Sequence, residues 1–128
     1  FRSNGGAVVT NSTSVITAAG ANPNAVYFGF DSSEIDAQGQ AVLNQQAQFL
    51  QANPSARVAI AGHTDERGSR EYNLALGERR AQAAQAYLAT SGVSASRMEA
   101  ISYGEDQPAD PGHDESAWAK NRRAEISY

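Results

Sequence analysis

The feature that most constrains the fold of this chain is the alternation of short strand patterns with longer helical patterns. Apolar or alternating segments typical of strands lie at residues 25–30, 57–63, 98–104 and 122–128. Helical patterns lie between them, at residues 36–53, 70–90 and 114–121. The order is therefore β-α-β-α-β-(α)-β. Strand–helix–strand crossovers need parallel strands, so we predict an α/β (α+β) sandwich with a mixed sheet of about four strands and both main helices packed on one face.

The first strand and helix carry clear local signals. Val26, Phe28 and Phe30 occupy alternate positions, which predicts a half-buried strand. Asp36 is placed to cap the following helix, whose apolar residues recur at helical spacing. The Asn53-Pro54 pair ends that helix, because proline disfavours the helical conformation of the residue before it.

The second strand and helix differ from the first pair in composition. Residues 58–61 are a continuous apolar run, typical of a central strand covered on both faces. The helix at residues 70–90 has a stripe of mostly small side chains, which allows close approach to a sheet: Leu74, Gly77, Ala81, Ala84 and Leu88. Ser91-Gly92 ends this helix.

Composition sets the domain organisation and removes several classes of function. Residues 1–24 are rich in Ser, Thr, Asn, Gly and Ala, so we expect a flexible tether there and one folded domain at residues 25–128. The formal net charge of −4 argues against a general binder of nucleic-acid phosphates. The chain has no cysteine, which excludes disulfides and thiol catalysis.

A local basic cluster stands out against this acidic background. Residues 61–80 contain four of the ten Lys and Arg residues, which indicates that an anionic group is bound there. Within this stretch, Gly62-His63-Thr64-Asp65 follows the second strand, at the sheet edge where α/β proteins usually place ligand sites. We expect Asp65 either to bind a cationic group or only to shape the turn, and His63 to hold that turn through one ring N–H.

Helical spacing separates the two adjacent arginines of the second helix. Arg80 lies on the same side as Asn73, Leu76 and Gly77, whereas Arg79 is rotated about 100° away, towards solvent. Arg80 and Asp65 would then place a positive and a negative charge on opposite sides of a small pocket, which could bind a zwitterionic ligand. The alternative is a plain salt bridge between the two, which contributes little at a surface.

Other candidate sites are weaker. Residues 120–123, Lys-Asn-Arg-Arg, have two interpretations. They form a second basic wall of the pocket, or they are solvated charges that keep an edge strand from pairing with another chain. His63 and Asp65 resemble a fragment of a metal site, and hence of a metal-dependent hydrolase, but the only other histidine is His113 in a distant loop. No nucleophile elbow, Walker loop or pair of catalytic carboxylates is present. We therefore expect no enzyme activity, no metal and no cofactor.

Five spaced motifs carry a resemblance to a known family. They are FxFDSSEI from residue 28, GHTDERGSREYN from residue 62, LGERRA from residue 76, ISYGEDQP from residue 101 and GHDESAWAKNRR from residue 112. They resemble the OmpA-like peptidoglycan-binding domain, in particular the lipoprotein members of that family, and the resemblance covers about residues 25–128.

The resemblance implies a module that holds the peptide stem of peptidoglycan without a covalent bond, chiefly through meso-diaminopimelate. In the family, the acid of the GHTD motif and the last arginine of LGERRA contact that residue, and these are Asp65 and Arg80 here. Asp65 would take the ammonium of the ligand and Arg80 its carboxylate. The resemblance also implies contacts or nearby roles for a further set: the backbone of Phe30, Asp31 and Ser32, the helix position of Leu76, and Asn73, Asn121, Arg122 and Arg123.

The resemblance also implies a cellular setting. Lipoprotein members lie in the periplasm, are anchored to the outer membrane by an N-terminal lipid, and bind the Tol-system protein TolB at a surface that overlaps the peptidoglycan site. Residues 1–24 have the composition of such a tether, although the acylated cysteine is not among them. Two alternatives stay open: an OmpA-like domain of a larger outer-membrane or motor protein, and a protein-interaction domain without cell-wall binding.

Overall fold

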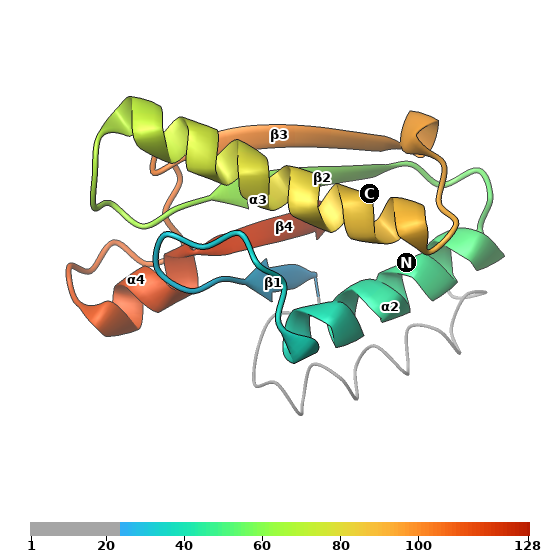
Figure 1. The fold of residues 1–128 in the computed structure, drawn as a ribbon, viewed down its shortest axis with the longest axis horizontal. Helices are drawn as coiled ribbons and strands as arrows, with labels where there is room; N and C mark the ends of the chain where they lie inside the picture. The colour runs from blue at the N-terminus through green and yellow to red at the C-terminus, as the bar shows by residue number, and fades with distance from the viewer. Residues whose placement is uncertain (1–23) are drawn as a thin grey trace.

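The expected order of strands and helices is present in the computed structural model, which describes residues 24–128 (Figure 1). The elements are β1 (Ala25–Tyr27), α2 (Ala37–Ala52), β2 (Val58–His63), α3 (Arg70–Thr90), the 3₁₀ turn η2 (Ala95–Arg97), β3 (Met98–Gly104), α4 (Glu115–Asn121) and β4 (Arg123–Ser127). The prediction of a tether falls, apart from its last residue, outside the described residues.

The four strands form one mixed sheet in the order β1-β4-β2-β3. β2 and β3 pair in parallel, whereas β4 pairs antiparallel with both β1 and β2. β1 and β2 therefore run in the same direction, as their crossover requires, but they are not neighbours because β4 lies between them. The predicted α/β sandwich with a mixed four-stranded sheet is confirmed.

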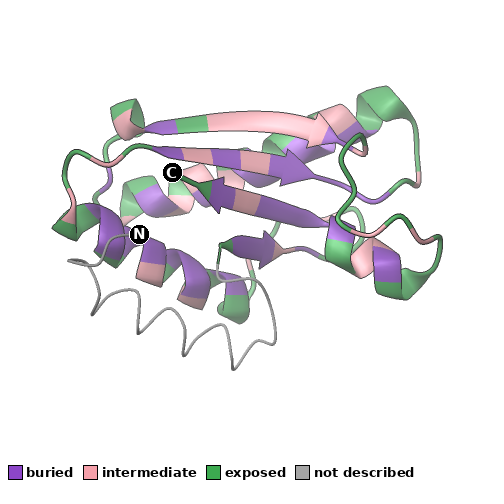
Figure 2. Cartoon of the chain, turned by 180° about the vertical axis from the view of Figure 1, so that it is seen from behind, coloured by how far each residue is buried: buried purple, intermediate pink, exposed green. Residues whose placement is uncertain are grey.

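Helices α2 and α3 cover one face of the sheet, as predicted (Figure 1). Val58 and Ile60 point towards them and are buried, whereas Ala59 and Ala61 point to the other face and are half-buried. Figure 2 shows that face, and no helix among residues 24–128 lies across its middle. The expectation that β2 is covered on both faces is therefore wrong, because the apolar run consists of small alanines on the uncovered side.

The first strand is shorter than its alternating pattern predicts. Val26 and Phe28 are buried, but the pairing with β4 ends at Tyr27, and Phe30 is 62% exposed. Asp31 then adopts a left-handed conformation with φ of 56°, which turns the chain towards α2. Phe30 therefore lies outside the sheet, at the surface beside the β2–α3 loop.

Two glycines allow α3 to lie directly on the sheet. A Cβ atom at Gly62 would stand 1.7 Å from the carbonyl oxygen of Gly77, and one at Gly77 would stand 2.4 Å from Ser102 Oγ. The backbones of β2 and α3 therefore touch without side chains between them. This contact fixes the position of Arg80, one turn further along α3, against the end of β2.

Candidate ligand-binding pocket

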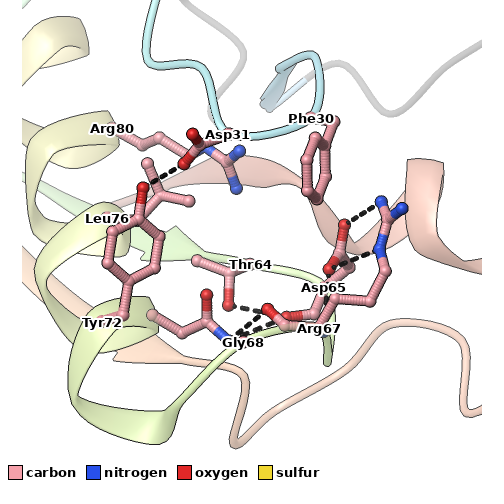
Figure 3. Close-up of a pocket in the computed structure, with 10 residues that line it drawn as sticks. Phe30, Asp31, Thr64, Asp65, Arg67, Gly68, Tyr72, Leu76 and Arg80 are labelled. Carbon is pink, nitrogen blue, oxygen red and sulfur yellow. Dashed lines mark hydrogen bonds and ion pairs between the residues drawn. The ribbon is translucent and has the colours of Figure 1, made fainter.

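A cavity of about 200 Å³ opens where β2 ends and α3 begins (Figure 3). Its walls come from the β1–α2 loop, the β2–α3 loop and the first turns of α3. Ten residues line it: Phe30, Asp31, Thr64, Asp65, Arg67, Gly68, Tyr72, Asn73, Leu76 and Arg80. Six of the predicted site residues are in this set. Ser32 and Arg122 are not, although each contacts a lining residue, Arg80 and Asp65 respectively. Thr64, Arg67, Gly68 and Tyr72 were not predicted.

The Asp65 carboxylate is buried and surrounded by donors. Arg67 donates from Nε at 3.2 Å, from Nη2 at 2.7 Å and from its backbone N–H at 3.0 Å. Arg122 Nη1 adds a contact at 3.4 Å. Burial alone would raise the pKa of Asp65, but the hydrogen bonds and charge of Arg67, with the bond from Arg122, hold that pKa below its usual value. Asp65 is therefore an anion at neutral pH.

Arg80 is fully buried and carries its charge without an ion pair among residues 24–128. Its guanidinium donates to three backbone carbonyls, those of Ser32 at 2.8 Å, His63 at 2.9 Å and Gly29 at 3.1 Å. Burial lowers the pKa of Arg80 to about 10, so the group stays protonated at neutral pH. Three of the five N–H groups of the guanidinium are thus engaged in these hydrogen bonds, and Arg80 lines the cavity.

The alternative of a plain Asp65–Arg80 salt bridge is wrong for this structure. The described ion pairs of Asp65 are with Arg67 and Arg122. Asp65 and Arg80 nevertheless line the same cavity, which they reach from the β2–α3 loop and from α3 (Figure 3). The predicted arrangement of opposite charges across a small pocket is therefore present.

The rim of the pocket is built from the β1–α2 loop and the start of α3. The hydroxyl of Tyr72 donates to the carboxylate of Asp31 (Figure 3), and this hydrogen bond raises the pKa of Tyr72. Leu76 supplies a buried apolar wall below them. Phe30 and Tyr72 both expose large parts of their rings, so the entrance is aromatic while the floor is charged.

Asn73 holds the β2–α3 loop together. Its buried Nδ2 donates to the carbonyl of Arg67 at 3.0 Å, to the carbonyl of Asp65 at 3.4 Å and to Glu105 Oε1 at 2.6 Å. Gly68, with φ of 100°, completes the turn into α3. The side chain of Asn73 therefore positions Asp65 and Arg67, and its amide donor is engaged within the protein.

His63 has a role other than the expected one. Its carbonyl accepts from Arg80, while its ring stacks on Tyr103 with centroids 5.5 Å apart. The buried Nδ1 has no hydrogen-bond partner among residues 24–128. The turn is held instead by the backbone, where the N–H of Thr64 donates to the carbonyl of Gly104 at 2.9 Å.

Protonation of His63 is expected to destabilise the folded chain. Burial, and after it the charge of Arg123, lower the pKa of His63 from 6.5 to about 4. Between these pH values the unfolded chain binds a proton that the folded chain does not. The free energy of unfolding should fall by about 1.4 kcal/mol per pH unit as the pH decreases through this window. Urea denaturation of the wild type and of His63→Gln checks this: the same slope in both proteins would contradict it.

The Lys120–Arg123 segment contributes one arginine to the site, and the strand that begins at its last residue, β4, is not an edge strand. Asn121 is buried and its Oδ1 accepts from two backbone N–H groups of the loop before α4. Arg123 is buried against Glu125 Oε2 at 2.5 Å. Only Arg122 reaches the site: its Nε donates to the carbonyl of Phe28 at 2.9 Å while Nη1 contacts Asp65.

The metal-site interpretation finds no geometry to support it. His63 lies against Tyr103, whereas Asp65 is held by two guanidinium groups. Among residues 24–128, no group of three or more potential metal ligands is assembled. In the same part of the chain, no helix has both the length and the apolar character to cross a bilayer.

Comparison with known proteins assigns the sequence and the fold of this chain to a class. The model of the OmpA family matches residues 27–122. The peptidoglycan-associated lipoprotein of Haemophilus influenzae is 51% identical over 105 residues, 82% of this chain and 69% of that protein. The protein of the same name from Pseudomonas aeruginosa is 50% identical over 100 residues, 78% of this chain and 59% of that protein.

A solved structure agrees with these relatives. The crystal structure of the peptidoglycan-associated lipoprotein from Burkholderia pseudomallei superposes with a TM-score of 0.80 at 45% identity, covering 89% of this chain and 98% of that one. This chain therefore belongs to the OmpA family and, within it, to the peptidoglycan-associated lipoproteins. The resemblance seen in the five sequence motifs is confirmed.

Proposed function

We propose that this chain binds the peptide stem of peptidoglycan without cleaving it, and so connects the outer membrane to the cell wall in the periplasm. The observation that carries the proposal is that the buried Asp65 carboxylate and the buried Arg80 guanidinium line one pocket without forming an ion pair with each other. The names of the relatives, which describe association with peptidoglycan, support the same function.

The charge balance of the pocket favours a zwitterionic guest. Two carboxylates, Asp31 and Asp65, and two guanidiniums, Arg67 and Arg80, line it. A guest with equal positive and negative charge leaves this balance unchanged. The free end of meso-diaminopimelate has an ammonium and a carboxylate on one carbon. In the proposal, Asp65 accepts from the ammonium and Arg80 donates to the carboxylate in charge-assisted hydrogen bonds.

The apolar part of the pocket matches the rest of that ligand residue. Leu76 forms one wall and Phe30 stands at the entrance. The methylene chain of diaminopimelate would lie against these two side chains while its polar end reaches the floor. The backbone of the β1–α2 loop, which already supplies two carbonyls to Arg80, fixes the position of the cationic wall.

The proposal includes a protein partner and an anchor. The relatives are named as lipoproteins, which supports an N-terminal lipid in the outer membrane for the full-length protein. As part of a Tol-Pal-like system, the partner would be TolB. The exposed rings of Phe30 and Tyr72 at the rim offer apolar contact area to such a protein, so TolB and the peptide stem would compete for the pocket.

Co-sedimentation with purified peptidoglycan tests the proposal. We expect the chain to pellet with sacculi of the diaminopimelate type and to release no soluble muropeptides during prolonged incubation. An exposed acidic residue outside the pocket, Asp106, which pairs with Arg70, provides the control variant Asp106→Asn, and this variant should pellet equally. Protein that stays in the supernatant, or muropeptides that appear with time, would contradict the proposal.

A further inference from the structure

In the free protein, the place proposed for the ligand ammonium is already taken by Arg67. Its guanidinium makes two hydrogen bonds to the Asp65 carboxylate, the shorter of 2.7 Å. An ammonium that approached Asp65 with Arg67 unmoved would stand about 4 Å from a second positive charge, and the two would repel each other more strongly near the protein surface than in bulk water. Binding is therefore easier if Arg67 moves.

Two aromatic rings lie against the Arg67 guanidinium. The guanidinium carbon lies 4.2 Å from the centroid of the Phe30 ring and 4.1 Å from that of the Trp118 ring. Cation–π contacts of this kind favour a cation that stays over the rings. With a ring at each of these distances, the guanidinium can slide within its own plane more easily than it can leave it.

The carboxylate of Glu115 is close enough to pair with Arg67 after such a movement. Glu115 Oε1 is 4.0 Å from Arg67 Nη2, and the Glu115 side chain is 67% exposed, outside the pocket. Arg122 already links the two carboxylates, with Nη1 at 3.4 Å from Asp65 and Nη2 at 2.8 Å from Glu115. Asp65, Arg67, Glu115 and Arg122 thus form a ring of alternating charge in which Arg67 is the one partly exposed cation.

We propose that Arg67 is a displaceable counter-ion: the ligand ammonium replaces its guanidinium at Asp65, and Arg67 transfers to Glu115 while it stays between Phe30 and Trp118. This inference rests on the proposed function. Every charge keeps a partner during the exchange, since Asp65 gains the ammonium as Arg67 gains Glu115. A stem whose amino group is acetylated has no cation to offer and leaves Arg67 in place, so the exchange also selects for a free ammonium.

A double-mutant cycle with the stem tripeptide L-Ala-γ-D-Glu-meso-diaminopimelate tests the exchange. Calorimetry should show that Arg67→Met, which keeps an apolar stem between the rings, binds roughly fivefold more tightly because the competing cation is gone. Glu115→Gln should bind roughly fivefold more weakly because the displaced guanidinium loses its new partner. In the Arg67→Met background, Glu115→Gln should have no effect, since Glu115 acts through Arg67.

Trp118 provides a second readout that a structural role of Arg67 would not move. It is the only tryptophan of the chain and stacks on the Arg67 guanidinium, so its fluorescence should change on binding in the wild type and stay constant in Arg67→Met. Weaker binding by Arg67→Met, or a Glu115→Gln effect that persists in its background, would overturn the exchange and leave the proposed function intact. No binding of the tripeptide by the wild type would overturn both.

Discussion

Asp65→Asn is expected to weaken binding of the stem tripeptide by roughly 10- to 150-fold, since hydrogen bonds to charged groups contribute roughly 1.5–3 kcal/mol. Asparagine keeps the shape of the side chain and one acceptor oxygen, but it has no charge for the ammonium. It also leaves Arg67 and Arg122, which contact Asp65 at 2.7 and 3.4 Å, without their common anion. The floor of the pocket then repels a cationic guest.

The matched control for this variant is Asp106→Asn. Asp106 also accepts two hydrogen bonds from an arginine, Arg70, at 3.2 and 2.7 Å, but it is exposed and does not line the pocket. Calorimetry should give wild-type affinity for Asp106→Asn, and circular dichroism should show native helix content for both variants. Wild-type affinity in Asp65→Asn would remove Asp65 from the site.

Replacing diaminopimelate by lysine in the stem tripeptide is the second change with a large expected effect. Lysine keeps the ammonium but lacks the neighbouring carboxylate, so Arg80 loses a partner that can accept two charge-assisted hydrogen bonds. We expect affinity to fall by at least about 100-fold, a sharper rejection than a difference in shape alone would give.

A variant of Arg80 shows whether this discrimination comes from the guanidinium. Arg80→Ala is a poor choice because it removes the guanidinium donor from three carbonyl groups, one of them the buried carbonyl of His63. Arg80→Lys keeps a charge and donors but lacks the planar fork, so the preference for diaminopimelate over lysine should shrink while thermal unfolding stays cooperative. An unchanged preference in Arg80→Lys, measured with both tripeptides, would assign the selection to another group.

The fold was predictable because its signals are local. Periodicity and caps define α2 and α3, and the structure confirms the capping role of Asp36, whose Oδ1 accepts from the N–H of Gly39 at 2.8 Å. The position of β4 between β1 and β2 depends on pairing between distant segments, which periodicity does not report. The end of β1 before Phe30 follows from that pairing, and for this reason the alternating pattern overestimated the strand.

The sequence pointed to Asp65 and Arg80 as members of one pocket, and both line the cavity, but it did not indicate their hydrogen-bond partners. Helical spacing places Arg80 and Arg79 on different sides of α3. Asp65 is indicated because it follows the carboxyl end of β2, where α/β sheets usually place ligand sites. The three carbonyl acceptors of Arg80 come from the β1–α2 loop and from the end of β2, 17 to 51 residues away in sequence. The contacts of Arg67 with Phe30 and Trp118 likewise bring together the β1–α2 loop, the β2–α3 loop and α4. Such contacts exist only once the chain is folded, although the position of Arg67 two residues after Asp65 was a usable local signal.

The measurement that tests the central claim most directly is an NMR titration of the isotope-labelled chain with the diaminopimelate tripeptide. The account predicts saturable shifts of the amide signals of residues 30–32 and Asp65 and of the Arg80 guanidinium signal, and much smaller shifts with the lysine tripeptide at equal concentration. A folded chain in which these signals stay unmoved by the diaminopimelate tripeptide would contradict the proposed binding site.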